Sequence, residues 1–301
     1  MERTSENAPA WIYGSMTALV TPFKGGAVDF DAYRTLVKRQ VDGGTSLIVA
    51  AGTTGEASTL TVEEQVEVIQ TCTEVVGGAI PVLAGVGSND TPTSLALAES
   101  AAQAGADGLL AATGYYNKPS QAGLLAHYEM LADATDLPII LYNVPGRTMS
   151  DISVETMATL SKHPNIAGVK DATGDLARVA SQRISCVEGF IQVSGEDMTA
   201  VGFNAMGGRG CISVSSNVAP YLCAKMQSAT LEGRWDEALA LQDQLAPLHA
   251  ALFTDTNPAP VKYALARLGL IQEELRLPLV PASEQAKLAV DNALEALGLL
   301  G

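Results

Sequence analysis

The chain has 301 residues, of which 47% are hydrophobic, which suits one large domain or one domain with an appendage. Its formal net charge of −15 argues against nucleic acid as a partner, because phosphate binding requires clustered Lys and Arg. A small anionic substrate would therefore need local positive groups to overcome the negative field of the whole chain.

The cysteines and histidines show neither a disulfide nor a metal-binding pattern. The four cysteines form no CxxC pair, which is typical of a reduced, cytosolic chain, and the three histidines lack metal-ligand spacing. The first nine residues are polar and carry no apolar signal core, and no run approaches the roughly eighteen apolar residues of a membrane span. We therefore expect a cytoplasmic protein without a metal, a cofactor or a membrane segment.

Short β-branched runs alternate with helical segments along most of the chain. Several runs are apolar on both faces, as in residues 47–51, which is typical of a parallel strand covered on both sides. Helix start signals lie between the runs, at Thr61, Asp90 and Ser153. The predicted strands are residues 15–21, 47–51, 81–86, 108–112, 138–143, 166–171, 190–195 and 210–215.

Eight strand–helix units predict a (β/α)8 barrel, the TIM barrel, over residues 1–232. The eighth helix should end near Gly233, and residues 233–301 keep a helical pattern that prolines interrupt. We expect a C-terminal appendage of three helices there. The alternative fold is an open, doubly wound sheet, but it would want a glycine-rich phosphate turn after the first strand, and no GxGxxG follows Thr21.

Lys170 is the strongest chemical feature, because it lies in the apolar run 166–171 near a predicted strand end. In such barrels, the loops at the C-terminal ends of the strands form the active site. An ammonium among apolar neighbours is costly unless it is paired or neutral, and desolvation favours the neutral amine, which is a nucleophile toward carbonyls. The alternative is a lysine that reaches solvent or pairs with Asp171.

Three further strand ends carry groups that suit a small carboxylate or a proton transfer. The turn 52–56 offers exposed amides and two threonine hydroxyls, although such a turn is often only a turn. Tyr142 can direct a phenol inward as an acid or base, and the planar fork of Arg147 suits a carboxylate. Their alternatives are a core-edge aromatic and a surface ion pair. Adjacent tyrosines at 115 and 116 commonly mark an interface.

Five short motifs occur in one order along the chain: GTTGE at 52–56, GYYNKPS at 114–120, YNVPGRT at 142–148, GVKDATG at 168–174 and SGED at 194–197. With them, the chain resembles the dihydrodipicolinate synthase family, within the N-acetylneuraminate lyase superfamily, from about Gly14 to Leu300. The resemblance implies a TIM barrel with C-terminal helices and a homotetramer built from tight dimers. It implies condensation of pyruvate with L-aspartate 4-semialdehyde to 4-hydroxy-tetrahydrodipicolinate, in lysine and diaminopimelate biosynthesis.

The resemblance also implies a catalytic role for four residues. Lys170 resembles the lysine that forms a Schiff base with pyruvate, and Tyr142 resembles the phenol that shuttles protons. Thr53 resembles the hydroxyl that links Tyr142 to a second tyrosine, Tyr116, which the family contributes across a subunit interface. This chemistry is consistent with the residue types, because an imine activates the methyl group of pyruvate and a chain of hydroxyls can move protons without histidine.

Four more residues match positions that bind substrate in the family. Thr54 resembles a ligand of the pyruvate carboxylate, and Ile212 and Gly195 match positions that line the same pocket. Arg147 resembles the group that receives the carboxylate of the aldehyde substrate.

Three other functions are alternatives to this synthase. An N-acetylneuraminate lyase or a keto-sugar-acid aldolase keeps the lysine and the first tyrosine, but tends to vary the threonine pair and to lack Arg147. A non-catalytic ketoacid-binding homologue would be identified by loss of the lysine, the tyrosines and the arginine, which are all present here. A phosphate-binding barrel isomerase expects a glycine-rich loop after strands seven and eight, whereas residues 207–210 precede the eighth predicted strand.

Feedback inhibition by lysine is expected to be weak or absent. Asn89 and Tyr115 match the inhibitor-binding pattern of sensitive relatives, but Thr93 stands where an acidic residue would hold the ammonium of the inhibitor. The other positions that differ from that pattern are Ala57, Ser58, Val62 and Gln65.

Overall fold

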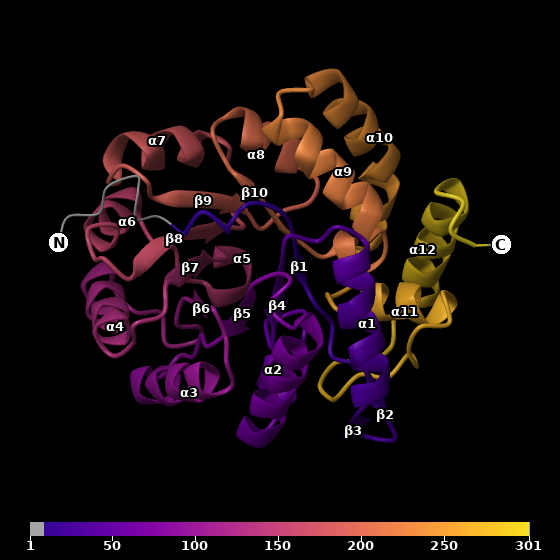
Figure 1. Ribbon diagram of the computed structural model, residues 1–301, viewed down its shortest axis with the longest axis horizontal. Coiled ribbons are helices and arrows are strands. Elements are labelled where there is room, and N and C mark those ends of the chain that lie inside the picture. Colours follow the sequence, from indigo (N-terminus) through magenta and orange to yellow (C-terminus); the bar gives the residue numbers. More distant parts are fainter. Residues whose placement is uncertain (1–8, 301) are drawn as a thin grey trace.

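The computed structural model describes residues 9–300, and they fold into a closed barrel of eight parallel strands followed by helices (Figure 1). The first strand pairs with both β4 and β10, which closes the sheet and excludes the open, doubly wound alternative. The predicted TIM barrel is confirmed. The strands are β1 (Gly14–Ala18), β4 (Leu47–Ala50), β5 (Val82–Gly85), β6 (Gly108–Ala112), β7 (Ile139–Asn143), β8 (Ile166–Asp171), β9 (Ile191–Ser194) and β10 (Gly210–Ser213).

The predicted strands agree with the observed ones to within a few residues, and the main difference follows β1. The prediction extended this strand to Thr21, but the Val20 amide donates a hydrogen bond to the Asn217 side chain and leaves the ladder. A small antiparallel hairpin follows, formed by β2 (Phe23–Lys24) and β3 (Ala27–Val28), which the sequence interpretation did not include. The expectation about a signal segment rests on residues 1–8, which lie outside the described residues.

Helices surround the barrel and begin where the capping residues predict. The side chain of Thr61 accepts from the Glu64 amide in a capping box, and those of Asp90 and Ser153 accept from a main-chain amide at the starts of residues 91–103 and 154–160. The helices are α1 (Phe30–Asp42), α2 (Val62–Val76), α3 (Thr91–Gln103), α4 (Gln121–Asp133), the short α5 (Pro145–Thr148), α6 (Val154–Leu160), α7 (Ala177–Ser185), α8 (Ala200–Ala205) and α9 (Pro220–Leu231), with 3₁₀ turns η2 (Ala57–Thr59) and η3 (Ser215–Asn217).

The hydrophobic core has two main parts, one between the barrel and its helices and one inside the barrel. Inward-facing side chains such as Met16, Leu83 and Ile140 are fully buried and fill the barrel interior. The interior is therefore packed rather than hollow, which leaves the loops at the C-terminal ends of the strands to form a site.

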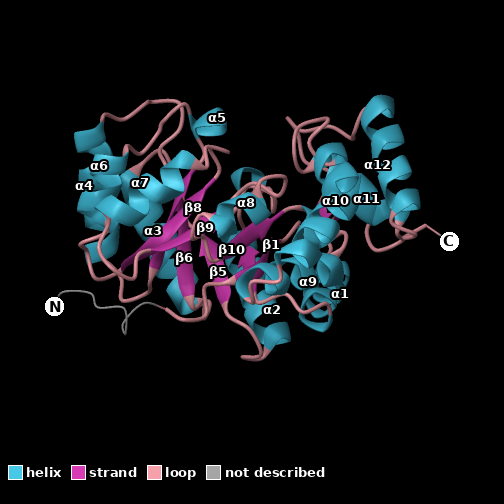
Figure 2. Cartoon of the chain, turned by 90° about the horizontal axis from the view of Figure 1, so that it is seen from above, coloured by secondary structure: helices cyan, strands magenta, loops and turns pink. Residues whose placement is uncertain are grey.

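Three helices follow α9, as predicted: α10 (Trp235–Ala251), α11 (Ala259–Arg267) and α12 (Glu284–Ala296). Figures 1 and 2 show them gathered at one side of the barrel, where α10 packs on α9 and α12 packs on both α10 and α11. The division into separate domains at residue 233 stays a prediction. Between residues 9 and 300, no helix combines the length and the apolar character that a membrane crossing requires.

Candidate active site

Lys170 and Tyr142 are direct neighbours in the barrel, because β8 pairs with β7 in a register that places one opposite the other. The Lys170 side chain is 5% exposed and that of Tyr142 is 8% exposed. The Lys170 Nζ lies 4.1 Å from the centroid of the Tyr142 ring, a cation–π distance. The predicted nucleophile and the predicted proton shuttle are therefore in contact.

The alternative reading of Lys170, an ion pair with Asp171, is wrong. Successive residues of a strand point to opposite faces, so Asp171 points away from the barrel interior. Its buried carboxylate accepts from Arg178 Nε at 3.2 Å, Gln182 Nε2 at 3.1 Å and the Thr173 hydroxyl at 2.6 Å. No ion pair of Lys170 is found within residues 9–300.

Gly195, directly after β9, lies beside this lysine, and Ile212 lies on β10, the next strand around the barrel. A Cβ at Gly195 would lie 3.0 Å from Lys170 Cε and 2.8 Å from Ala172 Cβ, so only glycine leaves room for the lysine stem. Ile212 is 1% exposed and packs in the same interior cluster as Tyr142. The absent side chain at Gly195 thus permits the close approach of Lys170.

The turn that follows β4 carries Thr53 and Thr54 in different settings. Thr53 is exposed and lines the cavity, whereas Thr54 is 3% exposed. Asn257 Nδ2 donates to Thr54 Oγ1 at 3.0 Å. Because that oxygen accepts from the amide, the Thr54 hydroxyl hydrogen is available to another acceptor.

Arg147 lies in the short helix α5 directly after β7, and its guanidinium is fixed by the same asparagine. Arg147 Nη2 donates to the main-chain oxygen of Asn257 at 3.3 Å. Asn257 precedes α11 and therefore brings the C-terminal segment into contact with both Thr54 and Arg147. Sequence reasoning missed this residue, because nothing in its local pattern indicates that the chain folds back onto the barrel.

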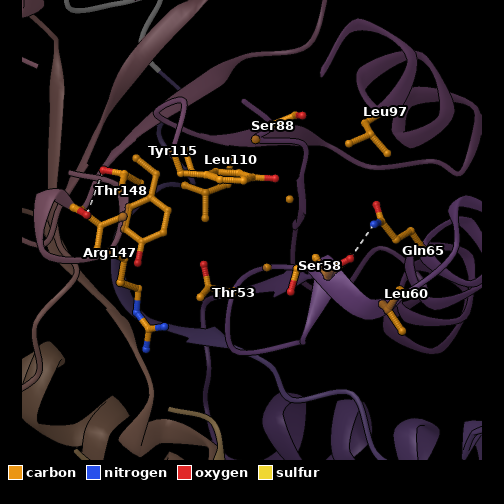
Figure 3. Close-up of a pocket in the computed structure, with 18 of the residues that line it drawn as sticks. Thr53, Ser58, Leu60, Gln65, Ser88, Leu97, Leu110, Tyr115, Arg147 and Thr148 are labelled. Atoms are coloured by element: carbon orange, nitrogen blue, oxygen red, sulfur yellow. Dashed lines mark hydrogen bonds between the residues drawn. The ribbon is translucent and has the colours of Figure 1, made fainter. Parts of the chain in front are cut away.

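A cavity of about 510 Å³ opens next to this site, and its lining does not include Lys170, Thr54, Gly195 or Ile212 (Figure 3). Thr53, Tyr142 and Arg147 line it, and Figure 3 shows Thr53 and Arg147 reaching into the same space, with Tyr115 across from them. Among the described residues, Arg147 is the only charged side chain that lines the cavity, and no carboxylate lines it. The local field in the cavity therefore favours an anion, although the chain as a whole is strongly acidic.

No histidine belongs to the lining that the described residues form around this cavity. His127 Nδ1 is hydrogen-bonded to the Thr91 hydroxyl and His249 Nδ1 to the Ser215 hydroxyl, and burial lowers the pKa of both imidazoles. In the part of the chain from 9 to 300, no cluster of His, Cys, Asp and Glu could hold a metal ion. The groups in the lining that can exchange a proton include the hydroxyls of Thr53, Tyr115 and Tyr142.

Of the four predicted catalytic residues, Thr53 and Tyr142 line the cavity and Lys170 contacts Tyr142, whereas Tyr116 does neither in the single chain. Its side chain is 90% exposed, and its backbone has a positive φ of 72°. Its neighbour Tyr115 lines the cavity instead. Within one chain, the predicted relay from Tyr142 through Thr53 to Tyr116 is thus not closed.

Comparisons with known proteins agree on one family. The model of the dihydrodipicolinate synthetase family matches residues 12–297. A 4-hydroxy-tetrahydrodipicolinate synthase from Methylobacterium radiotolerans is 55% identical over 95% of this chain and 96% of its own. The pyruvate complex of the chloride-inhibited dihydrodipicolinate synthase from Acinetobacter baumannii superposes with a TM-score of 0.94, at 43% identity over 96% of this chain and 100% of that one.

A second solved structure bears on assembly. It is described as the first monomeric dihydrodipicolinate synthase variant and matches with a TM-score of 0.94, at 40% identity over 96% of this chain and 98% of that one. Since a family model covers residues 12–297, one relative shares 55% of the residues and solved members share the fold, the chain belongs to the dihydrodipicolinate synthase family.

Proposed function

We propose that this chain condenses pyruvate with L-aspartate 4-semialdehyde to 4-hydroxy-tetrahydrodipicolinate, a step of lysine and diaminopimelate biosynthesis, through a Schiff base on Lys170. The observation that carries the proposal is a buried lysine amine 4.1 Å from the Tyr142 ring, beside a cavity whose charged lining is Arg147 alone. The name of the Methylobacterium relative and the bound pyruvate of the Acinetobacter structure support the same reaction.

The covalent steps begin at the amine of Lys170. The neutral amine attacks the keto carbon of pyruvate, and loss of water leaves an imine. The imine withdraws electrons from the methyl group, which loses a proton and becomes the nucleophilic carbon of an enamine. That carbon attacks the aldehyde of the second substrate, and the amino group of the same substrate then attacks the imine carbon, closes the ring and releases Lys170.

Each of these steps moves a proton, and Tyr142 is the group placed to exchange it. Its phenol belongs to a side chain that contacts the lysine and also lines the cavity. Thr53, in the same lining, passes protons between Tyr142 and the second tyrosine. A relay of hydroxyls suits a site that no histidine lines among residues 9–300.

Two separate groups bind the two carboxylates. The Thr54 hydroxyl and the main chain near Gly195 and Ile212 hold the carboxylate of pyruvate next to Lys170. Arg147 receives the carboxylate of the aldehyde substrate, for which its planar guanidinium is suited. This arrangement places the keto carbon of pyruvate next to the amine and the aldehyde carbon next to the enamine carbon.

The active assembly is a homotetramer made of two tight dimers, in the cytoplasm. Tyr116 is 90% exposed in the single chain. Its phenol completes the proton relay in the cavity of a partner subunit. Tyr116→Phe should lower the turnover rate while the dimer persists, which sedimentation measures. A fully active monomer would exclude the relay across subunits.

Trapping of the Schiff base tests the reaction. Borohydride treatment with pyruvate should leave a stable adduct on the peptide that contains Lys170, and Lys170→Arg should lose both the adduct and turnover while it keeps the fold. Initial rates with aspartate semialdehyde should exceed those of the reverse reactions with sugar acids, which an N-acetylneuraminate lyase or keto-sugar-acid aldolase would favour. An unmodified Lys170 in the parent chain would refute the mechanism.

A further inference from the structure

A buried ion pair joins the C-terminal helices to the turn that carries Thr53 and Thr54. Lys262, on α11, pairs with the carboxylate of Glu56, the last residue of that turn, and both side chains are 0% exposed. The Lys262 Nζ also donates to the main-chain oxygen of Glu274 at 2.9 Å and lies 4.0 Å from the centroid of the Phe23 ring. This lysine is enclosed on every side that the contacts describe, and it is not open to substrate.

The turn itself needs such an anchor. Ala51 and Glu56 bracket it, and both have positive φ angles, 50° and 54°, which side chains other than glycine rarely adopt. Backbone of this kind persists only where the surroundings hold it in place. Besides the ion pair, the Glu56 carboxylate accepts from the Arg276 amide at 3.2 Å, so two residues of the C-terminal segment hold it.

The same C-terminal segment contacts the turn a second time, at its binding residue. Asn257, five positions before Lys262, donates to Thr54 Oγ1 at 3.0 Å. The first turn of α11 lies between these two residues and keeps their separation constant. Thr54 and the end of its turn are therefore positioned by one short, rigid element.

From these contacts we infer that the Lys262–Glu56 pair is a positioning device for pyruvate binding, which orients the turn 52–56 and makes α11 a functional part of the active site. Burying an ion pair adds little stability relative to apolar side chains of the same volume, because desolvation offsets the attraction between the charges. Its effect here is on the orientation of the two threonines. The inference rests on the proposed roles of Thr53 and Thr54 in the pyruvate site.

The test separates positioning from stability with three variants and one control. Lys262→Met and Glu56→Gln each leave one partner of the pair, and the double variant leaves no lone buried charge. The matched control is Asp291→Asn, because Asp291 accepts from Tyr263 Oη at 3.0 Å and Arg267 Nε at 2.7 Å, and so ties α11 to α12 without touching the turn. Each protein is measured for its thermal midpoint, and for the pyruvate concentration that gives half-maximal adduct on Lys170.

The double variant is expected to recover most of the thermal midpoint that the single variants lose, yet to need about tenfold more pyruvate than the parent for half-maximal adduct. Asp291→Asn is expected to lower the midpoint and leave the pyruvate requirement unchanged. If a single variant does not fold, the pyruvate requirement of the double variant alone tests the inference. A double variant that saturates with pyruvate like the parent would overturn the inference, and the pair would then be only a structural contact between α11 and the turn.

A Thr54→Ala variant distinguishes this failure from failure of the proposed site. If Thr54→Ala raises the pyruvate requirement while the double variant does not, the pyruvate site stands and only the positioning role is lost. If Thr54→Ala saturates like the parent, the threonine has no part in pyruvate binding, and the inference falls with it.

Discussion

Asn257→Ala tests whether the two substrate carboxylates are bound by separable groups. The Asn257 side chain is 5% exposed and its amide donates to Thr54 Oγ1, whereas its main-chain oxygen accepts from Arg147 Nη2. Substitution by alanine removes the first contact and keeps the second. The variant should therefore weaken the binding of pyruvate and spare that of the aldehyde substrate.

The size of the effect follows from one lost hydrogen bond to a neutral hydroxyl. Such a bond contributes about 0.5–1.5 kcal/mol, and about 1.4 kcal/mol corresponds to a tenfold change in an equilibrium constant. The KM for pyruvate should rise about twofold to tenfold, with the KM for the aldehyde changed by less than about twofold. Because the lost contact positions Thr54 and does not touch Lys170, kcat should fall less than KM rises.

Steady-state rates with each substrate varied in turn provide the assay. Asn165→Ala is the control, because the Asn165 amide also ties loops together, at the oxygens of Ala132 and Thr135, away from the cavity. That variant should change the thermal midpoint and neither KM. A rise in the aldehyde KM with an unchanged pyruvate KM would refute the assignment of Thr54 and Arg147 to different carboxylates.

Three further predictions concern regulation, pH and crowding at the lysine. Lysine should inhibit the initial rate weakly or not at all, because Thr93 lines the cavity where an ammonium would need a carboxylate, and a steep inhibition curve at micromolar to low-millimolar lysine would contradict this. Hydrogen bonds from Arg276 lower the pKa of Glu64 from 4.5 to about 2, so the stability they contribute is present above pH 4.5 and is lost as the pH falls through about 2. Glu64→Gln should accordingly flatten the pH dependence of the thermal midpoint in that window, and an unchanged slope would exclude the pair as its source. Gly195→Ala should slow adduct formation about tenfold or more, because the new methyl group would lie 3.0 Å from Lys170 Cε, whereas a parental rate would show that the stem can shift.

The barrel could be predicted because its strands are short, apolar and separated by clear helix signals. The run at 47–51 predicted a doubly covered strand, and Leu47–Ala50 is buried throughout. The contact between Tyr142 and Lys170 follows from the same argument, because both lie near the C-terminal ends of consecutive strands and parallel strands align those ends. The hairpin β2–β3 escaped prediction because strands of two residues have no periodicity to detect.

The contribution of the C-terminal helices to the site could not be predicted by the same means. Lys262 lies in a largely apolar stretch, Ala259–Arg267, and so meets the criterion that singled out Lys170. On a helix, however, a lysine is buried only if its face docks against another element, and the docking is decided by tertiary structure. Glu56 likewise belongs to a recognised motif, but its partner is 206 positions away (262 − 56). Contacts at this separation leave no local pattern.

The acidity of the chain and its proposed anionic substrates are compatible because the carboxylates nearest the site are turned away or paired. Asp171 follows Lys170 directly, yet its side chain faces α7 and is compensated by Arg178. Glu56 ends the threonine turn, and Lys262 pairs with it in the interior. The carboxylates of Asp171 and Glu56 are thus each compensated by a cation, the buried carboxylate of Asp197 accepts from the amides of Val214 and Ser215, and Arg147 alone sets the sign of the cavity lining. The net charge of −15 is an outer-surface property, and the field that a bound carboxylate meets is set by which few side chains point inward.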